Sequence, residues 1–383
     1  MIFPKNFYWG TSTSAYQVEG GIKNDWSAIG GKYNAGKACD HYNKYEQDFD
    51  LAKNMNNNAH RFSIEWARIE PEQGKFDKKE IEHYKKVIDS LKKRGLEPFV
   101  TLYHWTLPNW FVEKGGWLNK ESVKYFTRYV EFVVKNLDVK FWVVLNEPNV
   151  YAPKCFLTGE WPPFKKSIFK YLKVSNRLSD SYKKSYKIIH KINPKAIVGI
   201  SQLTNYFEPA HKWFLPEVLI AKIFWLIYND YFCYKIKKHI DYFGFSYYFH
   251  DRIVWYPPFR KNLNKEVTDL GWEIYPKGIY FVLKNVKKYK KPIYITENGL
   301  ADAKDSRRKD FIINHLKHVN KAIEDGIDVR GYFHWSLLDN YEWARDGGYG
   351  PRFGLIEMNY KTMERIPRDS SLIYAKICKN NSL

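Results

Sequence analysis

The 383-residue sequence holds only four cysteines, and their spacing suits neither a metal site nor a redox site. Cys39, Cys155, Cys233 and Cys378 lie far apart, and none forms a CxxC motif, so a zinc or disulfide-exchange centre is not expected. Few thiols without a pairing pattern are typical of reduced cysteines in the cytoplasm. We therefore expect a cytoplasmic protein with no metal and no cofactor.

The sequence also lacks membrane signals. Residues 1–6 have no basic region followed by an apolar stretch, as a signal peptide would. The most apolar segment, Leu215–Tyr234, contains Glu217, Lys222, Asn229 and Asp230, which breaks the apolar span of a membrane helix. We expect this segment to be an amphipathic helix packed on the protein, with an interface to another subunit as the alternative. The sequence leaves open whether the protein forms a homo-oligomer.

Acidic residues are scarce relative to basic ones, with 42 Asp and Glu against 62 Lys and Arg, which gives a formal net charge of +20. Such a surplus can indicate a nucleic-acid or anionic-membrane partner. Here the lysines are scattered in small groups such as Lys183-Lys184, without a long basic run. We interpret them as a solvated lysine-rich surface and expect no nucleic-acid partner.

Short apolar runs alternate with amphipathic helical patterns along the whole chain, and no Pro/Gly/Ser-rich linker divides it. Helices are expected at residues 79–93, 121–135 and 308–325. The later β-rich runs are apolar almost throughout, as parallel strands buried on both faces should be. The eight runs are Phe7–Ser12, Asn58–Ser63, Glu97–Tyr103, Phe141–Asn146, Ala196–Gln202, Tyr242–Tyr248, Pro292–Thr296 and Gly331–Ser336.

Eight strand–helix units without a break predict an α/β protein with one domain over residues 1–383, a closed (β/α)8 TIM barrel. A doubly wound open sheet is the alternative architecture. That fold would use a glycine-rich phosphate-binding turn after an early strand, and the sequence has neither GxGxxG nor GxxxxGK[ST].

Two acids end separate strands of the expected barrel. Glu147 follows the fourth run and Glu297 follows the seventh, each beside an asparagine. Because barrel chemistry sits at the carboxyl ends of the strands, both side chains should meet at one mouth. Glycoside hydrolysis needs such a pair of carboxyl groups. One glutamate after a strand would be weak evidence, but the two contexts LNEP and ITENG together are much stronger.

The motifs LNEPNV (145–150) and YITENGL (294–300) resemble the acid/base and nucleophile signatures of glycoside hydrolase family 1. Within the family, the sequence most resembles archaeal members. Further matching motifs follow in order along nearly the whole chain, namely FYWGTSTSAYQVEG (7–20), ACDHYNKYEQD (38–48), RFSIEWARI (61–69), TLYHWTLP (101–108), TGEWPP (158–163), TDLGWEIYP (268–276) and GYFHWSLLDNYEW (331–343).

The resemblance implies a retaining β-glycosidase that hydrolyses terminal non-reducing β-D-glycosidic bonds through a covalent glycosyl-enzyme. Glu147 would be the general acid/base and Glu297 the nucleophile, with Arg61 and Tyr248 contacting the nucleophile. The two carboxyl groups should then lie about 5 to 5.5 Å apart. The substrate is expected to be a β-glucoside, with galactosides, fucosides or oligosaccharides as further candidates.

The resemblance also implies a ring of sugar-binding residues: Gln17, His104, Trp105, Asn146, Trp335, Glu342 and Trp343. Glu342 argues against a 6-phosphosugar, because its charge would repel a phosphate, although Arg345 and Tyr349 are near enough in sequence to keep a 6-phospho-β-glycosidase as an alternative. The candidates for an apolar aglycone wall are Tyr151, Trp161, Phe207 and Trp272, for which packing in loops is an equal explanation.

One position departs from the family pattern. Ser246 stands where members usually carry an asparagine, so a contact to the sugar or the nucleophile is in doubt. This lesion keeps open a catalytically weak sugar-binding barrel as another alternative. The resemblance further implies a cis peptide bond between Trp335 and Ser336.

Overall fold

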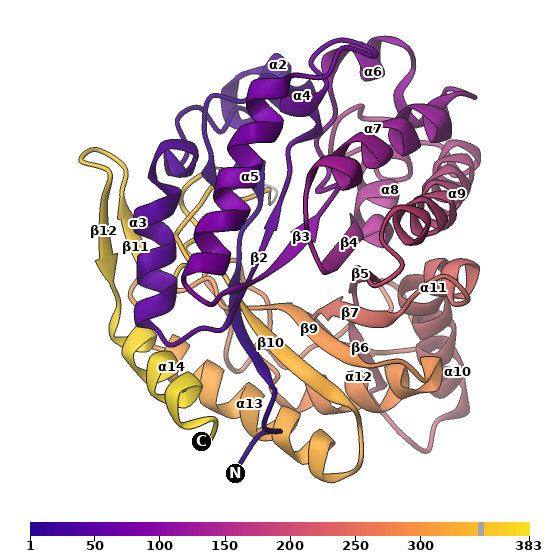
Figure 1. The fold of residues 1–383 in the computed structure, drawn as a ribbon. Helices are drawn as coiled ribbons and strands as arrows, with labels where there is room; N and C mark the ends of the chain where they lie inside the picture. Colours follow the sequence, from indigo (N-terminus) through magenta and orange to yellow (C-terminus); the bar gives the residue numbers. More distant parts are fainter. Residues whose placement is uncertain (344–347) are drawn as a thin grey trace.

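The computed structural model describes residues 1–343 and 348–383, and its centre is a closed barrel of eight parallel strands (Figure 1). The strands neighbour one another in the order β1-β10-β9-β7-β5-β4-β3-β2. They are β1 Tyr8–Ser12, β2 Ala59–Ser63, β3 Glu97–Thr101, β4 Phe141–Asn146, β5 Ile197–Leu203, β7 Tyr242–Ser246, β9 Ile293–Asn298 and β10 Val329–Trp335. Each of the eight expected runs supplies one strand, which confirms the (β/α)8 barrel.

Aromatic rings fill the end of the barrel where the strands begin. Phe99 stacks on Phe141 with ring centroids 4.1 Å apart, and Tyr242, Tyr294 and Phe333 complete this cluster. All five side chains are at most 4% exposed. Because this end is closed by apolar packing, polar side chains are confined to the opposite end, where the strands finish.

Helices surround the barrel (Figure 1). The expected helices are confirmed with ends shifted by at most one residue, as α5 Lys78–Lys93, α7 Ser122–Asn136 and α13 Arg308–Glu324. The remaining helices are α1 Ala15–Val18, α2 Asp25–Ile29, α3 His41–Asn54, α4 Trp66–Ile69, α6 Asn109–Glu113, α8 Pro148–Phe156, α9 Ile168–Ile192, α10 Leu215–Phe224, α11 Tyr231–Ile236, α12 Lys277–Val286 and α14 Asp369–Asn380.

Two small sheets that the sequence did not predict extend the loops of the barrel. Strands β6 (Tyr206–Pro209) and β8 (His250–Ile253) pair in parallel, directly after β5 and β7. Strands β11 (Ile356–Asn359) and β12 (Glu364–Pro367) form an antiparallel hairpin. Each of these strands has only four residues, which is too short for a periodic apolar pattern to be recognised.

The segment Leu215–Tyr234 folds as α10, a π-helical turn η3 (Trp225–Asp230) and the start of α11. As expected, the segment packs on the protein, with Ala221, Phe224 and Trp225 against Phe207 and Ile253. Several of its other aliphatic side chains are exposed, and its acidic residues are buried. Among the residues that the structure describes, no helix is long and apolar enough to cross a membrane.

Candidate active site

Glu147 and Glu297 are both buried where barrel strands end. Glu147 directly follows β4 and Glu297 is the fifth residue of β9; their exposed fractions are 4% and 5%. The charge of Glu297 is a direct contributor to the raised pKa of Glu147, so the two carboxyl groups share one electrostatic environment. The pair that the sequence predicted therefore meets at one mouth of the barrel.

Glu147 has an unusual backbone conformation. Its φ is 42°, in the left-handed region, where a residue other than glycine is uncommon. Pro148 follows as the first residue of α8 and disfavours a right-handed helical conformation at Glu147. The backbone N–H of Glu147 donates to the carbonyl oxygen of Ser201 at 2.7 Å. Neighbouring structure thus enforces a strained turn, a feature that clusters at functional sites.

The carboxylate of Glu297 is held at both oxygens. Nη1 of Arg61 donates to Oε1 at 2.5 Å, and the Tyr248 hydroxyl donates to Oε2 at 3.0 Å. Burial raises the pKa of Glu297 above its usual value, and Arg61 and Tyr248 offset part of this rise. Arg61 is itself completely buried, so its positive charge strongly favours the ionised form of this partner.

Glu147 has the opposite environment. Burial raises its pKa well above the usual range, and the nearby charge of Glu297 raises it further. Its Oε1 is buried and has no hydrogen-bond partner among the described residues. An unsatisfied buried oxygen beside an anion is best accommodated by protonation or by a ligand. The two acids therefore differ in environment, because burial raises the pKa of both but only Glu297 has a buried cation as a hydrogen-bond partner.

Ser246 lies beside Glu147, which answers the question that its departure from the family pattern raised. A hydrogen bond from Ser246 to Glu147 lowers the pKa of that carboxyl, against the larger effect of burial. Ser246 Oγ is 3.3 Å from Ser201 Oγ, which is 2.7 Å from Thr296 Oγ1. The serine thus contacts Glu147, as part of a buried chain of hydroxyl groups.

Asn146 connects Arg61, the partner of Glu297, to His104. Its Oδ1 accepts from Nη2 of Arg61 at 2.6 Å, and its Nδ2 lies 3.2 Å from Nε2 of His104. Burial, and then the charge of Arg61, lower the pKa of His104 well below its usual value, so its ring is neutral. Nδ1 of His104 is buried without a partner in the described part of the chain and is therefore available to a ligand hydroxyl.

Four indole rings gather next to this polar group. Trp105 packs against Trp161 and Trp343, with ring centroids 4.7 and 5.4 Å apart. Trp335 lies near-parallel to His104 at 6.1 Å. Nε1 of Trp343 is buried and has no partner among the described residues. The cluster offers flat apolar faces and one N–H donor, which is the chemistry that a sugar ring requires.

Two further predicted sugar ligands have partners within the protein. Nε2 of Gln17 donates to the carbonyl oxygen of Tyr341 at 2.6 Å and to Oδ1 of Asn340 at 3.0 Å. Both N–H groups of Gln17 are thus occupied, and its oxygen accepts from the hydroxyl of Ser14 at 2.6 Å. Oε1 of Glu342 accepts from the backbone N–H of Trp343 at 3.0 Å. Arg345 lies outside the described residues.

The candidates for an aglycone wall have different surroundings. Trp161 joins the indole cluster, and Trp272 packs against Tyr248, the partner of Glu297, with centroids 6.0 Å apart. Tyr151 packs against Tyr103 in the main core, and Phe207 packs beneath α10. Packing accounts for the burial of Tyr151 and Phe207, whereas Trp161 and Trp272 adjoin the site.

Sequence reasoning missed the residues that support this site. Thr101 accepts from Nε of Arg61 at 3.2 Å, while Ser201 and Thr296 form the hydroxyl chain. A Cβ at Gly299 would lie 1.7 Å from the carbonyl oxygen of Trp335, so only glycine fits there. This glycine is the G of the ENG motif, whereas the hydroxyl residues carried no signal. The cis peptide bond at Trp335–Ser336, expected from the resemblance, is present.

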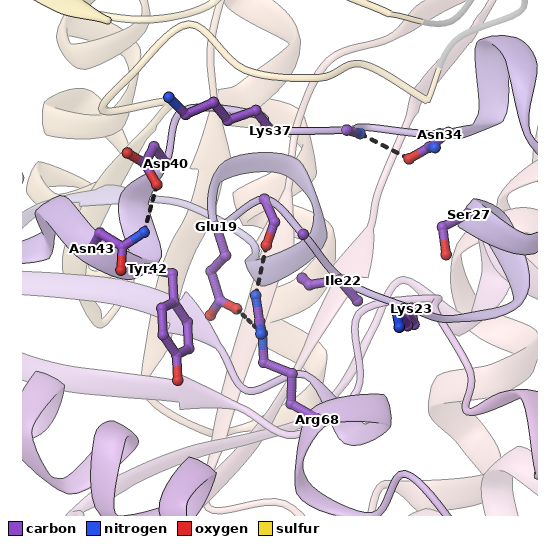
Figure 2. A pocket seen from close by; sticks show the side chains of 13 residues that line it. Glu19, Ile22, Lys23, Ser27, Asn34, Lys37, Asp40, Tyr42, Asn43 and Arg68 are labelled. Carbon is purple, nitrogen blue, oxygen red and sulfur yellow. Dashed lines mark hydrogen bonds and ion pairs between the residues drawn. The ribbon is translucent and has the colours of Figure 1, made fainter.

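A separate open pocket of about 780 Å³ lies between the loop after α1 and helix α4, and none of the predicted site residues lines it (Figure 2). Arg68 points into this pocket and is paired with Glu19 at 2.8 Å and with the carbonyl oxygen of Gly20 at 2.6 Å (Figure 2). Because its central cation is already neutralised, we assign no chemistry to this pocket.

Two buried carboxyl groups of unequal acidity, brought together by strand ends of one (β/α)8 barrel and flanked by indole rings, define the class of the protein as a barrel glycosidase that works through two acids. Comparison with known proteins makes this specific. Residues 1–242 and 233–383 match the model of glycosyl hydrolase family 1.

Similar proteins are found across the full length. A 1,4-beta-D-glucan glucohydrolase of Thermotoga neapolitana is 35% identical, with 100% of this chain and 99% of that protein covered. The solved beta-glycosidase from Pyrococcus horikoshii is 40% identical with a TM-score of 0.91, covering 100% and 96%. A beta-glucosidase from Thermotoga maritima in complex with glucoimidazole is 32% identical with a TM-score of 0.93, covering 100% and 99%. The chain therefore belongs to glycosyl hydrolase family 1 and is a retaining β-glycosidase.

Proposed function

We propose that this enzyme hydrolyses terminal non-reducing β-D-glucosides, and accepts β-galactosides and β-fucosides, with Glu147 as general acid/base and Glu297 as nucleophile. One observation carries the assignment of roles. Arg61 and Tyr248 bind both oxygens of Glu297, whereas burial and Glu297 itself favour the protonated form of Glu147. A nucleophile must be ionised and an acid must be protonated at the same pH.

The reaction follows from these two states. In the first step a Glu297 oxygen forms a bond to C1 while the bond from C1 to the leaving oxygen breaks, and that oxygen takes the proton of Glu147. In the second step the ionised Glu147 removes a proton from water, whose oxygen bonds to C1 as Glu297 leaves. Glu147 is then protonated again, and two inversions at C1 give net retention.

The sugar is proposed to lie between the acids and the indole cluster. His104, Asn146 and Glu342 would bind its hydroxyls, as would the indole N–H of Trp343. Trp335 would lie under the ring. The glucosidase of Thermotoga maritima binds glucoimidazole, which supports a glucose-sized pocket in this relative of it. Comparing kcat/KM for p-nitrophenyl β-glucoside, β-galactoside and β-fucoside tests the proposal; preference for an α-glycoside would contradict it.

Glu342 should exclude a phosphate at C6 of the sugar. A carboxylate facing a phosphate repels it strongly in a buried pocket, so kcat/KM for p-nitrophenyl β-glucoside should exceed that for its 6-phosphate by at least about 100-fold. Steady-state kinetics with both substrates measures this. Glu342→Gln removes the charge and should reduce the ratio of kcat/KM for the glucoside to kcat/KM for its 6-phosphate. Faster hydrolysis of the 6-phosphate would support the 6-phospho-β-glycosidase alternative instead.

Removing the hydroxyl of Ser246 should shift one limb of the pH profile. The hydrogen bond of Ser246 favours the ionised form of Glu147, so Ser246→Ala should raise the pKa of that acid. Because hydrolysis requires protonated Glu147, the alkaline limb of kcat/KM should move to higher pH, while the acid limb, set by Glu297, stays in place. Ser246→Thr keeps a hydroxyl and is the matched control. An alkaline limb that moves to lower pH would contradict the assignment.

We propose a cytoplasmic location for the enzyme from the state of its thiols. Cys39, Cys155, Cys233 and Cys378 are all buried and free in the structure, which supports a reducing compartment such as the cytoplasm. The family model matches the chain from residue 1 to residue 383, which supports one glycosidase domain over that range.

A further inference from the structure

Helix α10 and the turn η3 direct aliphatic side chains to solvent. Leu215, Leu219, Ile223, Leu226 and Ile227 are 64%, 48%, 50%, 51% and 52% exposed. Their spacing of three or four residues places them along one stripe of the helix surface. Scattered exposed apolar residues are ordinary in proteins, but a continuous stripe of them marks a surface that contacts something.

The orientation of this helix is fixed by polar contacts on its inner side. Glu217 is 1% exposed and accepts from the backbone N–H of His211 at 2.7 Å. Asn229 bonds both backbone groups of Asn205, at 3.0 and 2.8 Å. Asp230 accepts from Lys288 at 2.5 Å. Rotating the helix to bury its leucines would break these buried bonds, so their exposure is part of the fold.

Neighbouring segments extend the stripe into a wider apolar face. Phe169 at the start of α9 and Trp213 before α10 are both 82% exposed, and Trp255 after β8 is 57% exposed. The Arg260 guanidinium lies 5.5 Å from the ring centroid of Tyr228 in η3, which places the loop after β8 against this helix. Figure 1 shows α9, α10 and α11 on the same side of the barrel. We call this surface the apolar face.

Cations surround the apolar face, and exposed acids are absent from its segments. Residues 164–177, 211–227 and 252–265 contain one acidic residue, the buried Glu217. The same segments expose Lys170, Lys173, Lys212, Lys222, Arg260 and Lys261. A face with an apolar centre and a cationic border complements a surface whose charge is negative and whose interior is apolar.

We propose that the apolar face binds the surface of a bilayer that contains anionic lipids. The aliphatic stripe enters the boundary between headgroups and acyl chains, the exposed indoles of Trp213 and Trp255 lie at the headgroup level, and the lysines pair with lipid phosphates. A second copy of the chain fits less well. In a two-fold dimer the same patch faces itself, so the cationic borders would oppose each other without exposed acids between them.

The test is flotation of the full-length enzyme with vesicles of phosphatidylcholine alone and of phosphatidylcholine with phosphatidylglycerol in equal parts. We expect binding to the mixed vesicles, at least about ten-fold weaker binding without the anionic lipid, and a loss of that difference in high salt. The triple variant Leu219→Ser, Ile223→Ser, Leu226→Ser should no longer float. Leu372→Ser is the matched control, because Leu372 is 64% exposed on α14, which lies across the molecule from α10 (Figure 1).

Hydrolysis of a water-soluble p-nitrophenyl glycoside should be unchanged in all these variants, which separates this proposal from the assignment of the active site. Three outcomes would overturn the proposal. The first is that the wild-type enzyme does not float with the mixed vesicles. The second is that the Leu372→Ser control loses flotation as completely as the triple variant. The third is a dimer, detected by light scattering, that the triple variant converts to a monomer, since a second copy would then cover the face.

Discussion

Glu297→Gly should lower kcat for p-nitrophenyl β-glucoside by at least about 10⁴-fold, because it removes the carboxylate that we propose as the nucleophile. Arg61 and Tyr248 both donate to this carboxylate. In the variant these two donors remain, but the group that they orient is absent. Steady-state kinetics against the wild-type enzyme measures the loss.

Added azide distinguishes a lost nucleophile from a damaged fold. The azide ion is small enough to occupy the volume of the missing carboxylate and can attack C1 directly while Glu147 still protonates the leaving group. One inversion then gives the α-glucosyl azide. Circular dichroism is the control for folding. If azide does not restore activity and the native spectrum is also lost, the variant is inactive because it is unfolded. A folded variant that keeps wild-type activity would contradict the role of Glu297.

Glu147→Ala should divide substrates by their leaving groups. Alkyl glucosides and cellobiose need protonation of the departing oxygen, so their kcat/KM should fall by about 10²- to 10⁴-fold. A 2,4-dinitrophenyl glucoside leaves without a proton, so its first step should survive while attack by water becomes slow. A burst of dinitrophenolate followed by a slow steady state, with a lowered KM, is the expected signature.

Azide again provides the decisive comparison. In Glu147→Ala the glycosyl-enzyme still forms on Glu297, and azide replaces water in the second step, which gives the β-glucosyl azide. The two variants should therefore yield opposite anomers from one substrate. The alkaline limb of the pH profile should also vanish, because Glu147, whose pKa is raised by burial and by Glu297, no longer titrates. The α-azide from Glu147→Ala would reverse the assigned roles.

The barrel was predictable because its strands are buried on both faces and therefore appear as apolar runs. The two acids were predictable because each interrupts such a run with a charge at its end, as in ITEN before Gly299. The sugar ring depended on the family resemblance, since a single histidine or tryptophan after a strand has many explanations.

Other features depend on tertiary contacts that leave no local pattern. Thr101, Ser201 and Thr296 support the acids, but each resembles an ordinary strand residue in the sequence. The orientation of α10 and η3 depends in part on bonds from η3 to Asn205 and Lys288, which are distant along the chain. The sequence left this orientation open, because a periodicity shows which residues share a face and not which face is buried.

The most direct test of the whole account is proton NMR of the sugar as it is first released from a β-glucoside. If Glu147 and Glu297 reach the same anomeric carbon from opposite sides, at about 5 to 5.5 Å from each other, the β-anomer appears first and the α-anomer grows only by mutarotation. Initial release of the α-anomer would mean a single displacement by water, and the covalent role of Glu297 would be wrong.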